Sequence, residues 1–208
     1  LGENLEDLKK NGYYDRCDQH LQKTGLKRTD IIRNFDEPIG KNGAIAVLKG
    51  NLAPQGSVVK HSAVPKEMHS AVLKARPFDC EEDAISAILS HKIQPGDAVI
   101  IRYEGPKGSG MPEMFYTTEA ISSDPELSAS IALLTDGRFS GASKGPAIGH
   151  ISPEAAAGGP IALVEENDLI EIDIPKRVLR ICGVQGERKK PAEIELILDQ
   201  RRSTWKPR

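Results

Sequence analysis

The stretch IALLTDGRFSGASKG, residues 131–145, joins a run of four apolar residues to a loop with three glycines, two serines, an aspartate and an arginine. The apolar run predicts a buried strand, and the glycines predict a loop that starts where the strand ends. A second transition of this kind follows the apolar run 98–101, which leads into the Gly/Pro loop 103–111. Because ligands usually bind beyond the carboxyl ends of strands in open α/β sheets, these two loops are the first candidates for a functional site.

Strand and helix patterns alternate in the middle of the chain, and strands dominate toward its end. The patterns predict strands over residues 44–48, 58–59, 98–101, 131–134, 161–164, 168–174 and 178–182. They predict helices over residues 4–10, 79–91, 112–121 and 190–204, and a short helix that starts at 152–154 and ends at 158–159. Residues 60–74 fit neither pattern. The mixture predicts an α/β fold with a mixed sheet or two stacked sheets and helices on one side.

Local signals mark the starts of two helices and a domain boundary. Asp79, with Glu82 three residues later, makes a capping box for the helix 79–91. Pro112 suits the first position of the helix 112–121. Residues 1–41 are polar and mostly lack periodicity, so they are interpreted as an N-terminal arm or linker. The domain proper is therefore expected over residues 42–208.

The composition excludes several classes of protein. Hydrophobic residues make up 38% and charged residues 28% of 208, with a net charge of −2, which is typical of a soluble globular protein. No apolar run is long enough for a membrane span, and the N-terminal residues lack the apolar core of a signal peptide. Low aromatic content and near-neutral charge argue against nucleic-acid binding. Cys17, Cys80 and Cys182 are scattered, which predicts ordinary thiols in a reducing, cytoplasmic compartment.

Glu113 is the main candidate beyond the first loop. In the first turn of the predicted helix 112–121, its carboxylate is favoured by the helix dipole, which is a purely structural role. It is also a hard oxygen ligand of the kind that Mg²⁺ takes, one or two at a time, together with water and substrate. The residues by themselves leave both roles open.

Ser140 is the main candidate in the second loop. It lacks the G-x-S-x-G setting of a serine nucleophile, and a serine in a turn commonly bonds the local backbone, so its role is also left open. Asp136 and Arg138 are expected to orient the loop or to pair with each other. Ser143 is a further candidate for substrate binding. His150, in GHISPEA, is interpreted as a general base or as a residue that orients the structure or a ligand.

Several long motifs together resemble one known family. The motifs are YEGPKGSGMPEM (103–114), LLTDGRFSGASKGPAIGHISPEAAAGGPIALVEENDLIEIDIP (133–175), the terminal W-K-P, and the upstream LGENLEDL and KGNLAPQGSVVK. They are similar to the C-terminal domain of the IlvD/Edd dehydratases, which include dihydroxy-acid, 6-phosphogluconate and aldonic-acid dehydratases. The resemblance covers essentially the whole chain and implies the swivelling β/β/α fold.

The resemblance also implies cofactors and residue roles. Family members carry an iron–sulfur cluster on cysteines of a larger N-terminal domain, which supplies most of the Mg²⁺ ligands as well. Glu113 matches the carboxylate that this C-terminal domain adds to the Mg²⁺ site, and Ser140 matches the proposed base that takes the C2 proton. Asp136, Arg138, Ser143 and His150 are then supporting or substrate-binding candidates. Without its partner domain the isolated chain is expected to be inactive, and the whole enzyme is expected to be a homo-oligomer.

The resemblance further implies a substrate. The segment EMFYTTEAISSDPEL, residues 113–127, is more similar to the sugar-acid branch, particularly bacterial D-xylonate dehydratases. Dihydroxy-acid dehydratases tend to have LSPTSAI where this chain has FYTTEAI. The expected reaction is therefore dehydration of a sugar acid, D-xylonate, to a 2-keto-3-deoxy acid. The alternatives are a dihydroxy-acid dehydratase of branched-chain amino-acid synthesis and a non-catalytic binding domain.

Overall fold

The computed structural model describes residues 2–140 and 145–207. Contacts within the chain divide it into two compact units, Leu1–Gly43 and Ala44–Arg208. In the described part of the chain, no helix is both long and apolar enough to span a membrane.

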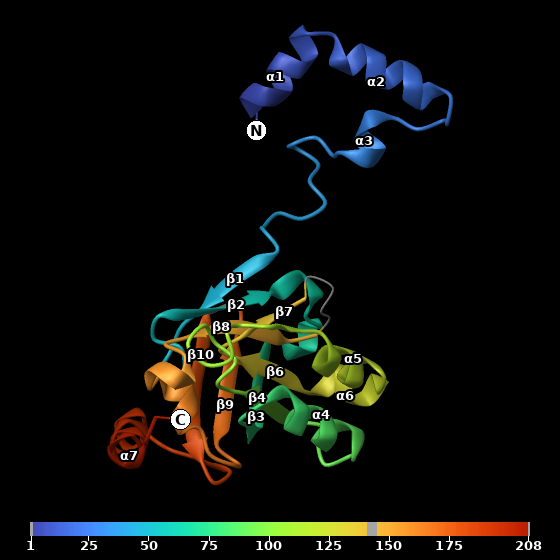
Figure 1. The fold of residues 1–208 in the computed structure, drawn as a ribbon. Helices are drawn as coiled ribbons and strands as arrows, with labels where there is room; N and C mark the ends of the chain where they lie inside the picture. The colour runs from blue at the N-terminus through green and yellow to red at the C-terminus, as the bar shows by residue number, and fades with distance from the viewer. Residues whose placement is uncertain (1, 141–144, 208) are drawn as a thin grey trace. The chain divides into compact units, whose positions relative to one another are not determined.

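The first unit is helical. It contains α1 (Gly2–Lys10), α2 (Tyr13–Gln22) and α3 (Arg28–Ile31), coloured blue in Figure 1. The expectation of a mostly irregular segment after residue 10 is wrong, because α2 has its less polar residues, Tyr13, Tyr14, Cys17 and Leu21, at helical spacing. The Arg28 guanidinium lies 4.0 Å from the ring centre of Tyr14 and pairs with Asp18, which ties α3 to α2. No described side chain between residues 3 and 43 is buried.

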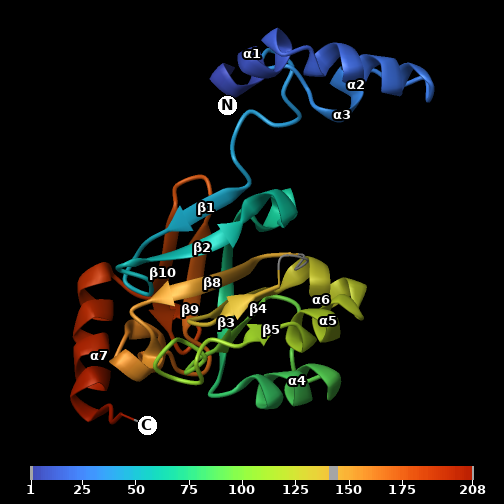
Figure 2. The ribbon, with the colours of Figure 1, turned by 45° about the horizontal axis from the view of Figure 1, so that its top comes forward.

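The second unit is built on a mixed sheet of nine strands in the order β1-β2-β8-β6-β4-β3-β9-β10-β11 (Figure 2). Its strands are β1 (Ile45–Leu48), β2 (Gly56–Lys60), β3 (Ser70–Phe78), β4 (Asp97–Ile101), β6 (Ala132–Thr135), β8 (Ala147–Ser152), β9 (Leu169–Asp173), β10 (Val178–Val184) and β11 (Glu187–Arg188). The central pairs β3–β4, β4–β6 and β6–β8 are parallel, and the outer pairs are antiparallel. This architecture confirms the predicted α/β fold class with a mixed sheet.

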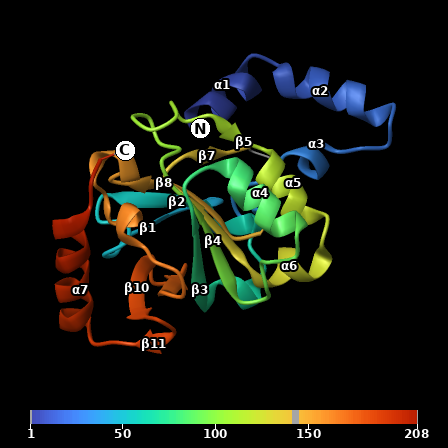
Figure 3. The same cartoon turned by 60° about the horizontal axis from the view of Figure 1, so that its bottom comes forward.

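Two apolar clusters lie on opposite sides of the central strands, because alternate residues of a strand point to opposite faces. Val99 and Ile101 of β4 face a cluster covered by α4 (Glu81–Leu89), α5 (Tyr116–Ser122) and α6 (Pro125–Ser130). Ala98 and Ile100 face a larger cluster that includes Ile194 of α7 (Pro191–Thr204). Figure 3 shows α4, α5 and α6 together on one side and α7 beside β10 on the other.

Three predicted elements differ from the structure. The helix expected from Asp79 begins at Glu81, because the Asp79 carboxylate pairs with Arg102 instead of capping the first turn. The helix expected from Pro112 begins at Tyr116, because residues 113–114 form a short strand with the second loop. The strand expected at 161–164 is a 3-10 helix, η4 (Pro160–Leu163), whose four residues are all buried.

Among the strands longer than two residues, β3 and β8 were not predicted at all. β3 contains Lys74, Arg76 and Pro77, and only Leu73 and Ala75 of its nine residues are buried, so its apolar alternation is short. It is nevertheless an inner strand, paired with β4 on one side and β9 on the other. Arg76 lies beside Asp97, whose side chain is buried, with its Nε 3.1 Å from the carboxylate. β8, in a glycine-rich stretch, pairs with β2 and β6. In both strands the pairing is between segments far apart in sequence, and local periodicity does not report it.

Candidate functional site

The two candidate loops start side by side. β4 and β6 are adjacent and parallel, and Ile101 is in register with Thr135, so both strands end at the same edge of the sheet. The loop 103–111 leaves β4 and the loop 136–140 leaves β6 at this edge. This is the position at which open α/β sheets bind ligands. The strand order therefore places the starts of both candidate loops at one edge of the sheet.

Asp136 holds the start of the first loop to the second. It is 2% exposed, and its two carboxylate oxygens accept hydrogen bonds from the backbone N–H groups of Glu104 (3.0 Å), Tyr103 (3.2 Å) and Ala155 (2.7 Å). Burial raises the pKa of Asp136 above its ordinary value, although these three hydrogen bonds act in the opposite direction. The structure thus gives Asp136 the loop-orienting role that was one of its two predicted roles.

Arg138 does not pair with Asp136. Its Nε donates a hydrogen bond to the backbone carbonyl of Met111, at 3.0 Å, which connects the second loop to the end of the first. Arg138 is also in register with Glu113, because β5 (Glu113–Met114) and β7 (Arg138–Phe139) form a two-stranded parallel sheet. The pairing that was expected within one loop is thus replaced by a pairing between the two loops.

The β5–β7 pair brings Glu113 alongside the segment that carries Ser140. Met114 is fully buried in the cluster under α4–α6, and Phe139 packs against the same cluster, so these neighbours anchor the pair. Glu113 is exposed, and Ser140 follows β7 directly. Glu113 is therefore in a strand and not in the first turn of a helix, which removes the helix-dipole explanation for its presence. Ser143 lies outside the described residues.

His150 lies next to this pair in a conformation that is unusual for its residue type. Its φ is 55°, in the left-handed region, where the register between β2 and β8 shifts as in a β-bulge. Its backbone N–H donates to the carbonyl of Gly137 at 2.9 Å, so the bulge is bonded to the second loop. Such bulges often re-aim a side chain next to a functional site. His150 lines two hollows, one shared with Asp136 and one shared with Ser140.

The hollow that contains Ser140 has a volume of about 180 Å³ and mostly apolar walls. Among the residues that the structure describes, its lining consists of Ile45, Val58, Lys60, Phe139, Ser140, Gly145, Ala147, Gly149 and His150. β8 contributes the small residues Ala147 and Gly149 to this lining, beside His150. A Cβ on Gly149 would lie 3.3 Å from the Gly137 carbonyl oxygen and 3.5 Å from the Phe139 ring. The neighbouring hollow around Asp136 and Glu154 has a volume of about 370 Å³ and more polar walls.

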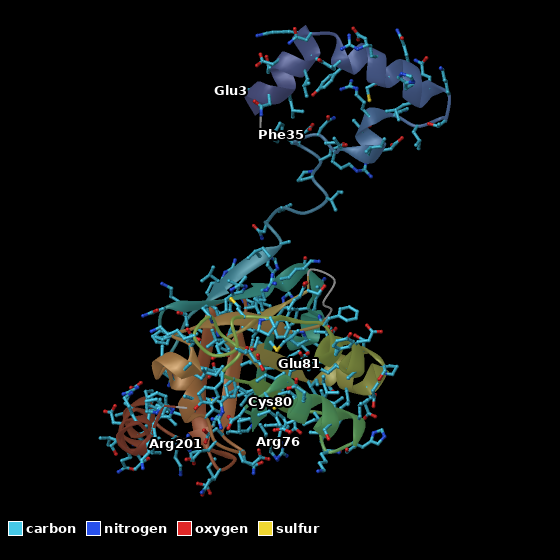
Figure 4. The ribbon with its side chains drawn as sticks, viewed as in Figure 1. Glu3, Phe35, Arg76, Cys80, Glu81 and Arg201 are labelled. Carbon is cyan, nitrogen blue, oxygen red and sulfur yellow. The ribbon has the colours of Figure 1, made fainter. Side chains whose placement is uncertain are left out.

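The residues described fit part of a magnesium site and no cluster site. Among them, no group of three or more His, Cys, Asp or Glu side chains is placed to hold a metal ion. Cys80, which Figure 4 labels beside Glu81, is a free cysteine and belongs to no such group among the described residues. Burial raises the pKa of the Cys182 thiol, which disfavours the thiolate that a metal needs. Glu113 is exposed and supplies one carboxylate, so ligands from elsewhere are required to complete a magnesium site.

Sequence reasoning missed the residues that hold the loops. Glu154 was interpreted only as part of a helix start, yet its carboxylate accepts hydrogen bonds from the backbone N–H groups of Lys107 and Gly108. Glu104 is 7% exposed, and its carboxylate accepts hydrogen bonds from the Ser109 hydroxyl and the Glu81 N–H. The glycines of the first loop were the one signal in the sequence for these contacts. They indicate that another segment approaches the loop closely, but they do not identify that segment.

Comparisons with known proteins place this α/β domain among dehydratase domains. Residues 30–208 match the model of the dihydroxy-acid/6-phosphogluconate dehydratase C-terminal family. The chain therefore belongs to this family.

Curated relatives agree with the family match. The chain is 57% identical over 191 residues to a dihydroxy-acid dehydratase of Agathobacter rectalis, which covers 91% of this chain and 32% of that protein. It is 56% identical over 227 residues to one of Lachnoclostridium phytofermentans, covering 98% and 39%. It is 53% identical over 208 residues to one of Methanosarcina barkeri, covering 100% and 34%. The chain thus spans about a third of the length of these relatives.

The names of the relatives bear on the substrate expectation. Each of the three is named a dihydroxy-acid dehydratase, and none of the three is named a sugar-acid dehydratase. These names agree better with the dihydroxy-acid alternative than with the sugar-acid interpretation of FYTTEAI in residues 113–127. Tyr116, the most exposed of the hydroxyl side chains there, is 71% exposed, whereas Thr117 and Thr118 are buried in the helix packing.

Proposed function

We propose that this chain is the C-terminal part of a dehydratase that converts a 2,3-dihydroxy acid into a 2-keto acid. The observation that carries the proposal is the pairing of β5 with β7, which brings Glu113 alongside the segment of Ser140 in a member of this family. The two residues come from different loops and depend on one small sheet for their placement. Such an arrangement suits a reaction in which one residue, Glu113, binds a metal ion and another, Ser140, acts as the base.

In this reaction Ser140 acts as the base. Its Oγ, as an alkoxide, accepts the proton from C2 while the C3 hydroxyl leaves as hydroxide. The abstracted proton and the hydroxide then leave as water, and the enol product becomes the keto acid. A serine hydroxyl has a pKa far above 7, so it needs nearby positive charge to act as an alkoxide. Glu113 is the carboxylate of this chain that would hold Mg²⁺, together with ligands from the preceding part of the enzyme. The iron–sulfur cluster and Mg²⁺ of the family supply Lewis-acid chemistry when they are bound.

The walls of the hollow beside Ser140 support a branched aliphatic acid as the substrate. Ile45, Val58, Phe139 and Ala147 present hydrocarbon to this space. An apolar wall favours an alkyl group and leaves the hydroxyls of a sugar acid without hydrogen-bond partners, which costs binding energy. Lys60, on the same lining, has the charge that attracts a carboxylate. The names of the relatives agree with this choice.

The test is a substrate comparison with the full-length enzyme. We expect turnover of 2,3-dihydroxyisovalerate to exceed that of D-xylonate and D-gluconate in kcat/KM. Preference for a sugar acid would overturn the substrate class and keep the reaction type. Absence of dehydration on all three acids, with cluster and Mg²⁺ loaded, would overturn the reaction type as well.

The proposed base is tested by one substitution. Ser140→Ala removes the hydroxyl, and we expect kcat to fall by about 10²-fold or more, as for loss of a general base. Ser203→Ala is the matched control, since Ser203 is an exposed residue of α7 that bonds only the local carbonyl of Gln200. Turnover of Ser140→Ala equal to that of the control would exclude Ser140 as the base.

The isolated chain is expected to show no dehydratase activity, because it lacks ligands for a cluster among its described residues. The family resemblance also leads us to propose a homo-oligomeric full-length enzyme. Sedimentation velocity of the full-length protein measures its mass directly, and a monomer across the micromolar range would contradict this proposal.

A further inference from the structure

We propose that Glu154 is a positioning residue, which holds the loop 103–111 in the shape that places Glu113 beside β7. Only the significance of Glu113 rests on the proposed function. The hold on the loop is a property of the contacts in this chain and can be measured without substrate or metal.

The carboxylate of Glu154 is the hydrogen-bond acceptor for the middle of the loop. Lys107 donates its backbone N–H to both oxygens, at 3.1 and 2.9 Å, and Gly108 donates its N–H to Oε2 at 3.2 Å. Successive backbone N–H groups that converge in this way form a concave site for an anion. In this fold the anion is a side chain from the segment after β8, more than forty residues away in sequence.

The glycines of the loop show how closely it surrounds the carboxylate. A Cβ on Gly105 would lie 2.4 Å from Oε2 of Glu154, so no other residue fits at that position without displacing Glu154. A Cβ on Gly108 would lie 2.1 Å from the carbonyl oxygen of Tyr103, where the loop folds back on itself. The closure is completed by backbone hydrogen bonds from Ser109 to Tyr103 and from Gly110 to Gly105.

Glu154 is itself held in place by its own backbone and by its neighbour. Its carbonyl oxygen accepts hydrogen bonds from the N–H groups of Ala157 and Gly159, at 3.1 and 2.9 Å. The next residue, Ala155, donates its N–H to Asp136, the same carboxylate that accepts the N–H groups of Tyr103 and Glu104. Asp136 therefore holds the start of the loop, and Glu154 holds its middle.

The end of the loop leads directly to Glu113. Met111 has a φ of 61° and offers its carbonyl to Arg138, and two residues later Glu113 is in register with Arg138 on β7. With its start and middle held and its end paired, the loop has little freedom to shift Glu113 along β7. Loss of the Glu154 carboxylate frees the middle, and displacement there is transmitted to the β5 pairing.

The first experiment measures the loop itself. Glu154→Ala and Glu154→Gln are made in the full-length protein, and hydrogen exchange of the peptide covering residues 103–112 is followed by mass spectrometry in metal-free buffer. We expect exchange about tenfold faster or more in the alanine variant, as for a loop that opens locally. The glutamine variant should lie between it and the wild type, since its amide oxygen still accepts one N–H. Glu195→Gln, on the exposed side of α7, is the control.

The second experiment measures the consequence for Glu113. We expect the Mg²⁺ concentration for half-maximal activity to rise about tenfold in Glu154→Gln, because loss of a supporting partner lowers metal affinity by this order. The kcat at saturating Mg²⁺ and the pH–rate profile should stay close to the wild type. A lost limb of that profile would make Glu154 a general base and overturn the positioning role.

Two further outcomes are decisive. Unchanged exchange of residues 103–112 in both variants would overturn the proposal, whatever the activity. Faster exchange with unchanged Mg²⁺ dependence would overturn the connection to Glu113. If the wild type has no dehydratase activity, the proposed function fails, while the exchange measurement still decides whether Glu154 holds the loop.

Discussion

Asp168 and Asp136 are both buried, but the fold compensates their charges differently. Asp168 is 0% exposed and accepts two hydrogen bonds from the Arg201 guanidinium, at 2.5 and 3.0 Å, with a third from the Glu165 N–H. Asp136 is 2% exposed and accepts its hydrogen bonds from three backbone N–H groups. One carboxylate is neutralised by a cation, and the other, among the residues that the structure describes, is stabilised by peptide dipoles alone.

The difference matches the location of each residue. Arg201, labelled on α7 in Figure 4, connects that helix to the carbonyl of Leu163 in η4 as well as to Asp168, so this ion pair fastens α7 to the segment that leads into β9. Asp136 instead connects loops. Its carboxylate accepts hydrogen bonds from their backbone N–H groups, so no cationic side chain is needed beside the site. The raised pKa of Asp136 follows from that choice, since its burial is not offset by a counter-charge.

Breaking the ion pair should have the largest effect on stability. Arg201→Met keeps the apolar stem of the side chain but leaves Asp168 buried without a cation, and we expect the free energy of unfolding to fall by about 3–5 kcal/mol. Urea denaturation followed by circular dichroism measures it. The control is Arg202→Met on the same helix, whose pair with Asp199 is exposed on both sides. Equal losses in the two variants would contradict the comparison.

Replacing the dipole-stabilised carboxylate should have a smaller effect on stability. Asp136→Asn turns one oxygen into an amide N–H₂ that faces backbone donors, and we expect a loss of about 1–3 kcal/mol. Limited proteolysis should then show earlier cleavage in residues 103–111 than in α7. Earlier cleavage in α7 would mean that Asp136 supports the whole fold and not the loops.

The smallest expected effect is on pH dependence, and it has opposite signs for two aspartates. The pKa of Asp136 is raised in the folded state, so the native protein binds that proton more tightly than the unfolded chain. Its contribution to stability therefore increases as pH falls toward the ordinary aspartate range. The hydrogen bond from Lys176 lowers the pKa of Asp173, whose contribution is present above the unfolded pKa and is lost as pH falls through the folded value.

Unfolding of Asp136→Asn and Asp173→Asn, each compared with the wild type between pH 7 and pH 3, measures this difference. The loss caused by Asp136→Asn should grow on acidification, and the loss caused by Asp173→Asn should shrink. If the two losses changed with pH in the same direction, the hydrogen bond from Lys176 to Asp173 would not explain a difference in titration between Asp173 and Asp136.

Elements with strong local patterns were predicted well. The apolar runs correspond to β4 and β6, and the alternating isoleucines correspond to β9. The helix expected at 190–204 is α7, which begins one residue later. Each of these segments buries a face that its own sequence displays, so periodicity is sufficient to find it.

Elements that depend on distant partners were not predicted. β3 contains Lys74 and Arg76 but is held between two strands, and Glu113 is in a strand only because residues 138–139 lie beside it. Ser140 and Glu113 were both singled out from the sequence, whereas Glu154 was not given a role in the site. A carboxylate that binds backbone N–H groups leaves no trace in the identity of the residues that donate them.

The sequence by itself determined the α/β class, the two strand ends where the loops begin, and membership of the dehydratase family, because apolar periodicity, glycine content and long motifs are local properties. Only the tertiary structure decided how the loops are held together. Asp136 and Glu154 bind peptide N–H groups that every residue except proline carries, so their partners are selected by the path of the chain in space and not by the chemistry of the side chains.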